Sequence, residues 1–171
     1  TSYLTDDGYY EAPPNASIVF PPTMDDFNMN EYSQLQGLTL KADVNITIDA
    51  NISADQIILE ATNIFLSKNK PITLRPEEHG GNDAVFSINA EGNIYANDTY
   101  ILIEEDGGGG TGIDVDINAQ GDIYFRDSVF ECHETGADRF TFDIVSEYGK
   151  LDITNLSITT ADTGSMVPGN H

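Results

Sequence analysis

The chain has 171 residues and a mass of 18.6 kDa, which is enough for one domain with a hydrophobic core. It contains 7 Lys and Arg residues against 29 Asp and Glu, and its formal charge of −22 would be repelled by nucleic-acid phosphates and by anionic membrane surfaces. Nucleic-acid binding is therefore excluded, and no apolar run approaches the roughly 20 residues of a membrane-spanning helix.

Residues 1–34 are predicted to form an extended N-terminal arm. Pro13-Pro14 and Pro21-Pro22 flank the short apolar stretch Ile18, Val19 and Phe20. Because proline fixes φ and removes a backbone donor, we expect at most one short strand in this arm. The chain begins with Thr1, as a mature protein does after removal of a signal peptide, so we expect a secreted protein.

Residues 35–163 are predicted to form an all-β domain, followed by a C-terminal tail at 164–171. Short runs rich in Ile, Val, Thr, Phe and Tyr alternate with polar residues, and this period of two indicates strands. No segment has apolar residues at helical spacing over three turns, so we expect no helix longer than one turn. The first strand candidates are Leu38–Leu40, Val44–Ile48, Gln56–Leu59, Ile64–Leu66 and Ile72–Leu74.

The later part of the domain repeats itself. Phe86–Tyr95 aligns without gaps on Val115–Tyr124, a shift of 29 residues, and a third copy at Phe142–Leu151 follows 27 to 28 residues later. An earlier, looser copy is placed at Ile46–Ala50, extending to Ile57. Its spacing to the next copy is stretched by residues 68–83, which contain two prolines and Gly80-Gly81 and are predicted to be a loop carrying one extra strand.

Each repeat contains three strand segments, which predicts one coil of a parallel β-helix. A coil buries its inward Ile, Val and Phe side chains only when another coil stacks on it at about 4.8 Å. Gly92, Gly121 and Gly149 occupy equivalent places and are expected to stack at one tight corner. We expect about four to five coils; the alternative is an antiparallel β-sandwich or jelly roll, which also consists of many short strands.

Two features concern the cellular environment. The single cysteine, Cys132, cannot form an intramolecular disulfide and is interpreted as a buried small apolar residue. The 14 Asn and 25 Ser and Thr residues give five Asn-x-Ser/Thr sequons, against roughly two expected by chance, which favours a glycoprotein at the cell exterior. The candidate sites are Asn15, Asn45, Asn51, Asn97 and Asn155.

Some of the carboxylates are candidates for a catalytic or metal site. Asp114 and Asp116 lie two apart on one predicted strand and so share a face, near the acidic stretch 104–106. Such a cluster is compatible with a solvated surface, with calcium ligation, or with a pair of glycosidase carboxylates. No other cofactor is indicated. A metal site of Cys132, His133 and His79 is disfavoured because neighbours on a strand point to opposite faces.

The stretches Phe86–Tyr95 and Val115–Tyr124 share the pattern apolar-x-Ile-Asn-Ala-x-Gly-x-Ile-Tyr. This pattern resembles the coils of filamentous-haemagglutinin-like adhesins and related surface β-solenoids. The resemblance covers residues 84–163 and, more loosely, residues 38–68. It implies a structural or adhesive role at a surface, with no catalytic residues to carry over.

A stack of four or five coils leaves strand edges unpaired at both ends. A head-to-tail contact between copies would cover them and build an open homopolymer, because such a contact is heterologous. We therefore expect a non-enzymatic extracellular subunit of a fibre, sheath or surface layer, with Ile18, Val19 and Phe20 adding a strand to a neighbour. The alternatives are a monomeric adhesin or carbohydrate-binding domain, and a polysaccharide-active β-helix enzyme.

Overall fold

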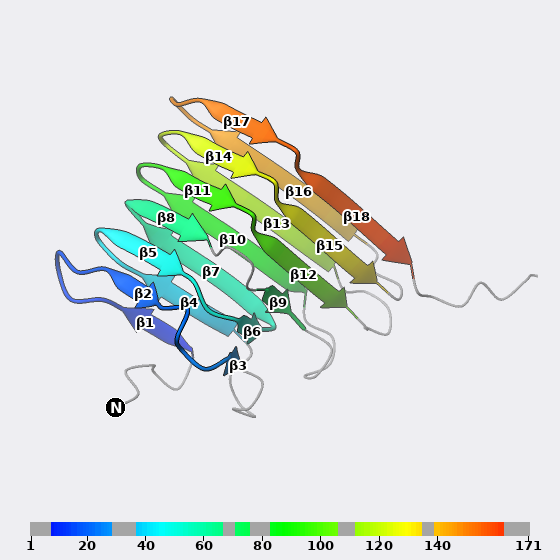
Figure 1. Cartoon of the computed structure of the whole chain (residues 1–171), viewed down its shortest axis with the longest axis horizontal. Helices are drawn as coiled ribbons and strands as arrows, with labels where there is room; N and C mark the ends of the chain where they lie inside the picture. Colours follow the sequence, from blue (N-terminus) through cyan, green and yellow to red (C-terminus); the bar gives the residue numbers. More distant parts are fainter. Residues whose placement is uncertain are drawn as a thin grey trace, which may run out of the picture.

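The computed structural model describes residues 8–28, 37–66, 71–75, 83–105, 112–134 and 139–162. The described part consists of short strands joined by turns, without a helix. The strands form three six-stranded sheets, which we name A, B and C, and successive strands enter the three sheets in turn. Three consecutive strands therefore make one coil, and the six coils stack in chain order (Figure 1).

Sheet A consists of β1 (Tyr9–Glu11), β4 (Gly37–Lys41), β7 (Gln56–Ala61), β10 (Ala84–Ala90), β13 (Gly112–Ala119) and β16 (Arg139–Ser146). Sheet B consists of β2 (Ile18–Phe20), β5 (Asn45–Ile48), β8 (Asn63–Leu66), β11 (Ile94–Asn97), β14 (Ile123–Arg126) and β17 (Leu151–Thr154). Sheet C consists of β3 (Phe27–Asn28), β6 (Ile52–Ala54), β9 (Ile72–Leu74), β12 (Tyr100–Glu105), β15 (Val129–Glu134) and β18 (Ser157–Asp162).

The predicted parallel β-helix is confirmed, because the strand pairs within each sheet are parallel, whereas a sandwich or jelly roll is antiparallel. The register also follows the repeat read from the sequence. Ile117 pairs with Ile88 on one side and with Ile144 on the other.

The earliest copy of the repeat was placed wrongly. The segment that pairs with Phe86–Ala90 is Ile57–Ala61, 29 residues before it, whereas Ile46 lies on β5 in sheet B. The second coil misled the alignment because Leu38 pairs with Ile57 only 19 residues later. A single residue, Asp55, separates β6 from β7 at this corner. The strand expected as an extra one between residues 68 and 83 is β9, an ordinary member of sheet C.

The N-terminal arm is also more structured than predicted. Its described residues contain three strands rather than one, and β1, β2 and β3 pair in parallel with β4, β5 and β6. The prolines lie in the connections before and after β2, where no ladder hydrogen bond is required of them. The arm is thus the first coil of the solenoid. Its predicted boundary at residue 34 and the tail at 164–171 lie outside the described residues.

The core runs along the inside of the stack. Inward side chains alternate with outward ones on nearly every strand, so that like residues lie over one another, as do Ile46, Ile64, Ile94 and Ile123. Phe130 packs its ring against Phe86, Phe125 and Phe142, with ring centroids 4.9 to 6.2 Å apart. Full burial of each such side chain contributes about 1.5–3 kcal/mol. Cys132 is buried within this core.

Candidate functional site

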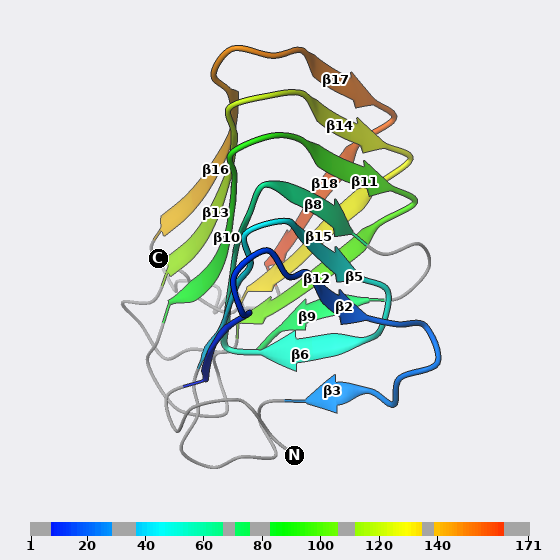
Figure 2. The ribbon, with the colours of Figure 1, turned by 90° about the vertical axis from the view of Figure 1, so that its left-hand side faces the viewer.

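The last coil, β16–β18, leaves apolar side chains of the core row uncovered. Phe140, Leu151, Ile153 and Ile158 stack on Ile113, Ile123, Phe125 and Phe130, all of which are fully buried. Because no further described coil lies over them, these four side chains are 39–45% exposed. Figure 2 shows this coil at one extreme of the stack and β3 at the other. We call the end formed by β16–β18 the C-terminal face.

The C-terminal face also carries unpaired backbone. β16, β17 and β18 are the terminal strands of the three sheets, and within the described part of the chain each has a neighbour on one side only. They contain 8, 4 and 6 residues. Edges of this length that are flat and partly apolar are templates for pairing with another chain.

The first coil, at the opposite end, is better covered. Its inward Ala12 and Ile18 are buried, and Tyr10, Phe20 and Phe27 are half-buried against the core. The rings of Phe20 and Phe27 lie 5.3 Å apart at an angle of 58°. Its strands are short, with 3, 3 and 2 residues.

The predicted assembly strand, Ile18 to Phe20, is β2 of this coil. It pairs with β5 of its own chain, where Ile18 lies opposite Ile46 and Phe20 opposite Ile48. Val19 points outward and is exposed. β2 therefore has only its remaining edge to offer to a neighbouring molecule.

The three corner glycines lie over one another between sheets A and B. The amide of Gly121 donates to the carbonyl of Gly92 at 2.8 Å. A Cβ on Gly121 would lie 2.7 Å from that carbonyl oxygen, and a Cβ on Gly149 would lie 2.6 Å from the Asp122 amide nitrogen. The corner needs glycine because successive backbones approach closely; among the described glycines only Gly8 has a positive φ.

A ladder of Asn and Asp side chains next to this corner was missed by sequence reasoning. Asn63 Oδ1 accepts from the amide of Asn93 at 3.0 Å, Asn93 Oδ1 from that of Asp122 at 2.7 Å, and Asp122 Oδ1 from that of Lys150 at 2.7 Å. The bond to Lys150 lowers the pKa of Asp122. Asn63 is the first residue of β8, and Asn93, Asp122 and Lys150 immediately precede the later sheet B strands, a spacing that the sequence displays.

The corner between sheets B and C depends on Asp and Asn in the left-handed region. Asp98, Asp127 and Asn155 follow β11, β14 and β17 and have φ of 51°, 49° and 54°. These residue types adopt this conformation more readily than other non-glycine residues. Their spacing in the chain could have identified this corner before the structure.

The five sequons differ in accessibility. Asn15 and Asn155 are exposed in turns, whereas Asn45, Asn51 and Asn97 are half-buried at or beside strand ends. The Nδ2 of Asn51 donates to Asp26 at 2.6 Å, and that of Asn155 donates to Asp127 at 2.7 Å. Asn15 and Asn155 are therefore the most exposed of the five sequon asparagines.

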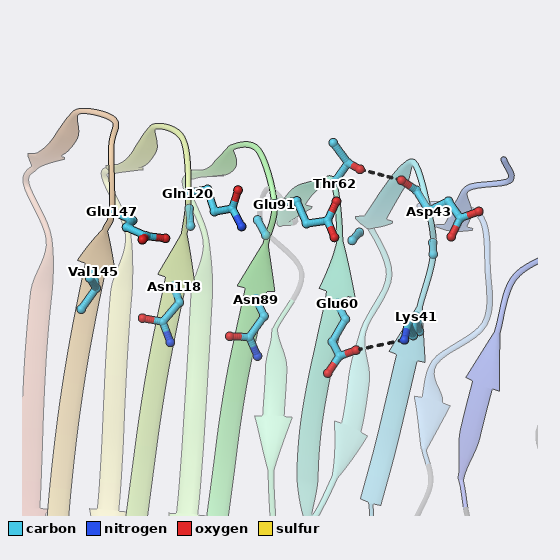
Figure 3. A pocket seen from close by; sticks show the side chains of 14 residues that line it. Lys41, Asp43, Glu60, Thr62, Asn89, Glu91, Asn118, Gln120, Val145 and Glu147 are labelled. Carbon is cyan, nitrogen blue, oxygen red and sulfur yellow. Dashed lines mark hydrogen bonds and ion pairs between the residues drawn. The ribbon is translucent and has the colours of Figure 1, made fainter. Parts of the chain in front are cut away.

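A groove of about 670 Å³ runs along the outside of the stack, where the strands of sheet A end (Figure 3). Its floor is a row of small residues, Ala42, Ala61, Ala90 and Ala119. One wall is formed by side chains in register from coil to coil: Lys41, Glu60, Asn89, Asn118 and Val145. Figure 3 shows a second row with Thr62, Glu91, Gln120 and Glu147. Lys41, the one cation among the described residues that line this groove, has its Nζ 3.9 Å from Glu60 Oε2.

The structure places Asp114 and Asp116 on the outer face of β13, as their spacing predicted. Asp114 accepts hydrogen bonds on one oxygen from Arg139 at 2.5 Å and on the other from Thr141. Asp116 accepts from Asn118 at 2.8 Å. Among the described residues no three His, Cys, Asp or Glu side chains gather as a metal site. Asp106 and His79 lie outside those residues.

Aromatic rings form a second ladder, on the outer face of sheet B. Phe65, Tyr95 and Tyr124 stack with centroids 5.0 and 5.3 Å apart and nearly parallel planes. The Arg126 guanidinium lies 5.4 Å from the centroid of Tyr124. Because the ring faces cover one another, they hold coils together and leave mainly ring edges for a ligand.

Two polar clusters link the later coils. Glu131 accepts from Tyr100 at 2.6 Å and contacts His133 at 2.6 Å; the bond from Tyr100 lowers the pKa of Glu131, and the same bond raises the pKa of Tyr100 to about 12. Asp152 accepts from Arg126 at 2.7 Å and from Lys150 at 3.1 Å. The Arg126 hydrogen bond is the main cause that lowers the pKa of Asp152 to about 2.

Comparison with known proteins gives no relative: no family model, no curated protein and no solved structure matches the chain. Among the described residues no helix is long and apolar enough to cross a membrane. The parallel solenoid is consistent with the repeat fold of surface adhesins.

Proposed function

We propose that this protein is a non-enzymatic extracellular structural subunit that assembles with further copies by stacking solenoids end to end. The observation that supports the proposal best is the C-terminal face. It combines four exposed apolar side chains of the core row with three unpaired strand edges. Inside the stack, the next coil covers the equivalent side chains and pairs with the equivalent strands.

The physical reason is the way a solenoid is stabilised. Each coil gains most of its stability from its neighbours, so a terminal coil without a polar cap favours association. A second solenoid end can satisfy both the apolar side chains and the backbone groups. A globular partner without a free strand edge would cover only the side chains.

Two sequence features support a place outside the cell. The five sequons exceed chance, and Asn15 and Asn155 are exposed. A surface solenoid similar to filamentous-haemagglutinin-like adhesins would also be secreted. Intact-mass measurement of the protein from its native source tests this part. A glycan mass at Asn15 or Asn155 is expected, and an unmodified chain would contradict the glycoprotein proposal.

The assembly proposal is tested by light scattering coupled to size exclusion over a wide concentration range. High salt should be included, because it screens repulsion between chains of charge −22. The wild type is expected to associate, and Ile153→Asp is expected to remain monomeric because a charge at the contact loses its solvation. Val19→Asp is the matched control, since Val19 is also exposed but points outward from the first coil. A wild type that stays monomeric throughout contradicts the proposal.

A second candidate function is recognition of a neutral glycan along the groove of Figure 3. The amides of Asn89 and Asn118 lie at the same position of two successive coils, and such groups donate to and accept from sugar hydroxyls. Titration with a soluble neutral glucan is the test, with Asn118→Ala expected to weaken binding and Thr159→Ala, on sheet C, expected to leave it unchanged. No binding by the wild type would remove this candidate, and release of reducing sugar would favour the enzymatic alternative instead.

A further inference from the structure

We propose that the partner of the C-terminal face is the C-terminal face of a second copy, so that two solenoids join tail to tail about a two-fold axis. The inference rests on the proposed end-to-end assembly and gives it an orientation. It departs from the head-to-tail filament that the sequence suggests. A two-fold contact closes on itself and stops at two chains, whereas a head-to-tail contact continues without limit.

The first argument is the match of apolar surface. The row that begins with Ile18 in the first coil ends with Leu151 in the last, and the two end members are 6% and 44% exposed. The first coil therefore has little uncovered core to offer to another molecule. The C-terminal face of a second copy presents the same uncovered side chains as the first and can bury them in exchange.

The second argument is the length of the strand edges. The C-terminal face presents strands of 8, 4 and 6 residues, whereas the first coil presents strands of 3, 3 and 2. A head-to-tail contact would leave most of β16 unpaired. About a two-fold axis, one edge strand pairs in antiparallel fashion with the same strand of the partner chain. Each of the other two edge strands then pairs with the other one in the partner chain. The longest strand, β16, is the one we place at the axis, with β17 facing β18 of the partner.

Charge also differs between the two ends. The described part of the first coil, residues 8–28, contains Glu11, Asp25 and Asp26 and no Lys or Arg, whereas residues 139–162 contain Arg139 and Lys150 beside four acidic residues. Two like-charged ends repel in proportion to the product of their charges. A contact between two C-terminal faces, each of mixed sign, therefore costs less than one that involves the purely acidic first coil.

The first measurement is stoichiometry by sedimentation equilibrium in high salt across a wide range of concentrations. A monomer–dimer equilibrium without larger species is expected. Growth into longer oligomers would overturn the tail-to-tail orientation while leaving end-to-end assembly in place. A monomer at every concentration would overturn both proposals. A variant truncated after residue 162 would then show whether residues 163–171 cover the C-terminal face.

The second measurement mixes tagged Ile153→Asp with untagged wild type and recovers the tag. In the tail-to-tail arrangement the variant has no usable contact, so no wild-type chain is expected with it. In a head-to-tail arrangement the variant keeps an intact first coil and would capture one or more wild-type chains, which would overturn the proposal. Tagged Val19→Asp is the matched control and should capture wild type as fully as the tagged native chain does.

Discussion

The first and the last coil are built from the same three-strand unit, yet they finish the solenoid differently. Ile18 and Leu151 are the two ends of one stacked row, and their exposed fractions are 6% and 44%. Around Ile18 lie the half-buried rings of Phe20 and Phe27 and the turns that contain the prolines. Around Leu151 the inward side chains Ile153 and Ile158 are equally uncovered.

The difference shows that an apolar repeat determines which side chains of a coil point inward, but not whether the end coil of the stack is covered. An end is largely covered when half-buried side chains of short strands pack against the core, as Phe20 and Phe27 do at the first coil. It stays open when the strands are long and regular, as at the last coil. The same regularity that makes β16–β18 easy to recognise in the sequence makes them templates for association.

The largest loss of stability is expected from adding a methyl group at a glycine corner inside the stack. Gly121→Ala places a Cβ against the Gly92 carbonyl and the Asn93 side chain, with coils on both sides that prevent relief. A loss of about 3 kcal/mol in the free energy of unfolding is expected from such overpacking. Denaturant unfolding of the monomer measures it.

Two further glycines sharpen this test. Gly149→Ala creates contacts that are at least as close, but the last coil has no neighbour beyond it and can move, so a smaller and local loss is expected. Gly37→Ala meets only ordinary contacts, the nearest being Gln56 Cβ at 3.6 Å, and should change stability by no more than about 0.5 kcal/mol. Equal losses for Gly121→Ala and Gly149→Ala would contradict the difference between an inner and an outer coil.

The next prediction compares the stability lost when a side chain is removed at either end of one stacked row. Ile18→Ala removes a buried side chain and should cost about 2 kcal/mol or more, the lower part of the range for Ile→Ala in cores. Leu151→Ala removes a side chain that is already half in water, so a loss of about 1 kcal/mol or less is expected. Thermal and denaturant unfolding at low concentration, where the chains are monomers, measure both. A larger loss for Leu151→Ala would mean that the first coil is not closed as described.

Much of the solenoid could be predicted because its information is local and periodic. The alternation of Ile88, Ala90 and Ile94 with polar residues, and its recurrence after 29 residues, fixed the strands, the coil length and the glycine corner. The sequence could not place the short second coil, because Asp55 alone forms its corner and the repeat length there falls to 19 residues. A search at constant spacing misses such a coil.

The state of the two ends could not be predicted for a different reason. Pro13-Pro14 and Pro21-Pro22 indicate interruptions, and the sequence alone does not distinguish an extended arm from the corners of a coil. Only the pairing of β1 and β2 with β4 and β5 decides between them. Likewise, the apolar residues of β17 resemble those of β14, and their exposure depends on what stacks on them.

A third prediction concerns local opening at the two ends. Amides of β17 and β18 that lack a neighbouring coil should exchange with solvent at least about tenfold faster than those of β11 and β12 in the dilute monomer. Hydrogen exchange followed by mass spectrometry measures the difference. Raising the protein concentration should slow exchange in the last coil and leave β2 of the first coil unchanged. Slowing at β2 instead would favour the head-to-tail contact.

The smallest change in stability is expected from removing the charge of Asp152, the carboxylate of the last coil that accepts a hydrogen bond from Arg126 of the preceding coil. The hydrogen bond from Arg126 and that from Lys150 lower the pKa of Asp152 from 3.8 to about 2. Since the folded-state pKa lies below the unfolded value, the contribution of Asp152 to stability is fully present above about pH 4 and is lost as the pH falls through about 2. Asp152→Asn should therefore lower the unfolding midpoint slightly at neutral pH, because solvent screens such surface pairs, and the difference from wild type should vanish near pH 2.

Asp143→Asn is the matched control for this measurement. Asp143 is an exposed carboxylate of the same coil and lies in register with Asp116 of the preceding one. Its neutralisation removes a like-charge neighbour, so stability at neutral pH should stay equal or rise slightly. Unfolding midpoints of the three proteins from pH 2 to pH 7 separate the two cases. If Asp152→Asn instead gave the larger difference at the acidic end, the link between Arg126 and Asp152 would not be what holds this edge of the last coil in place.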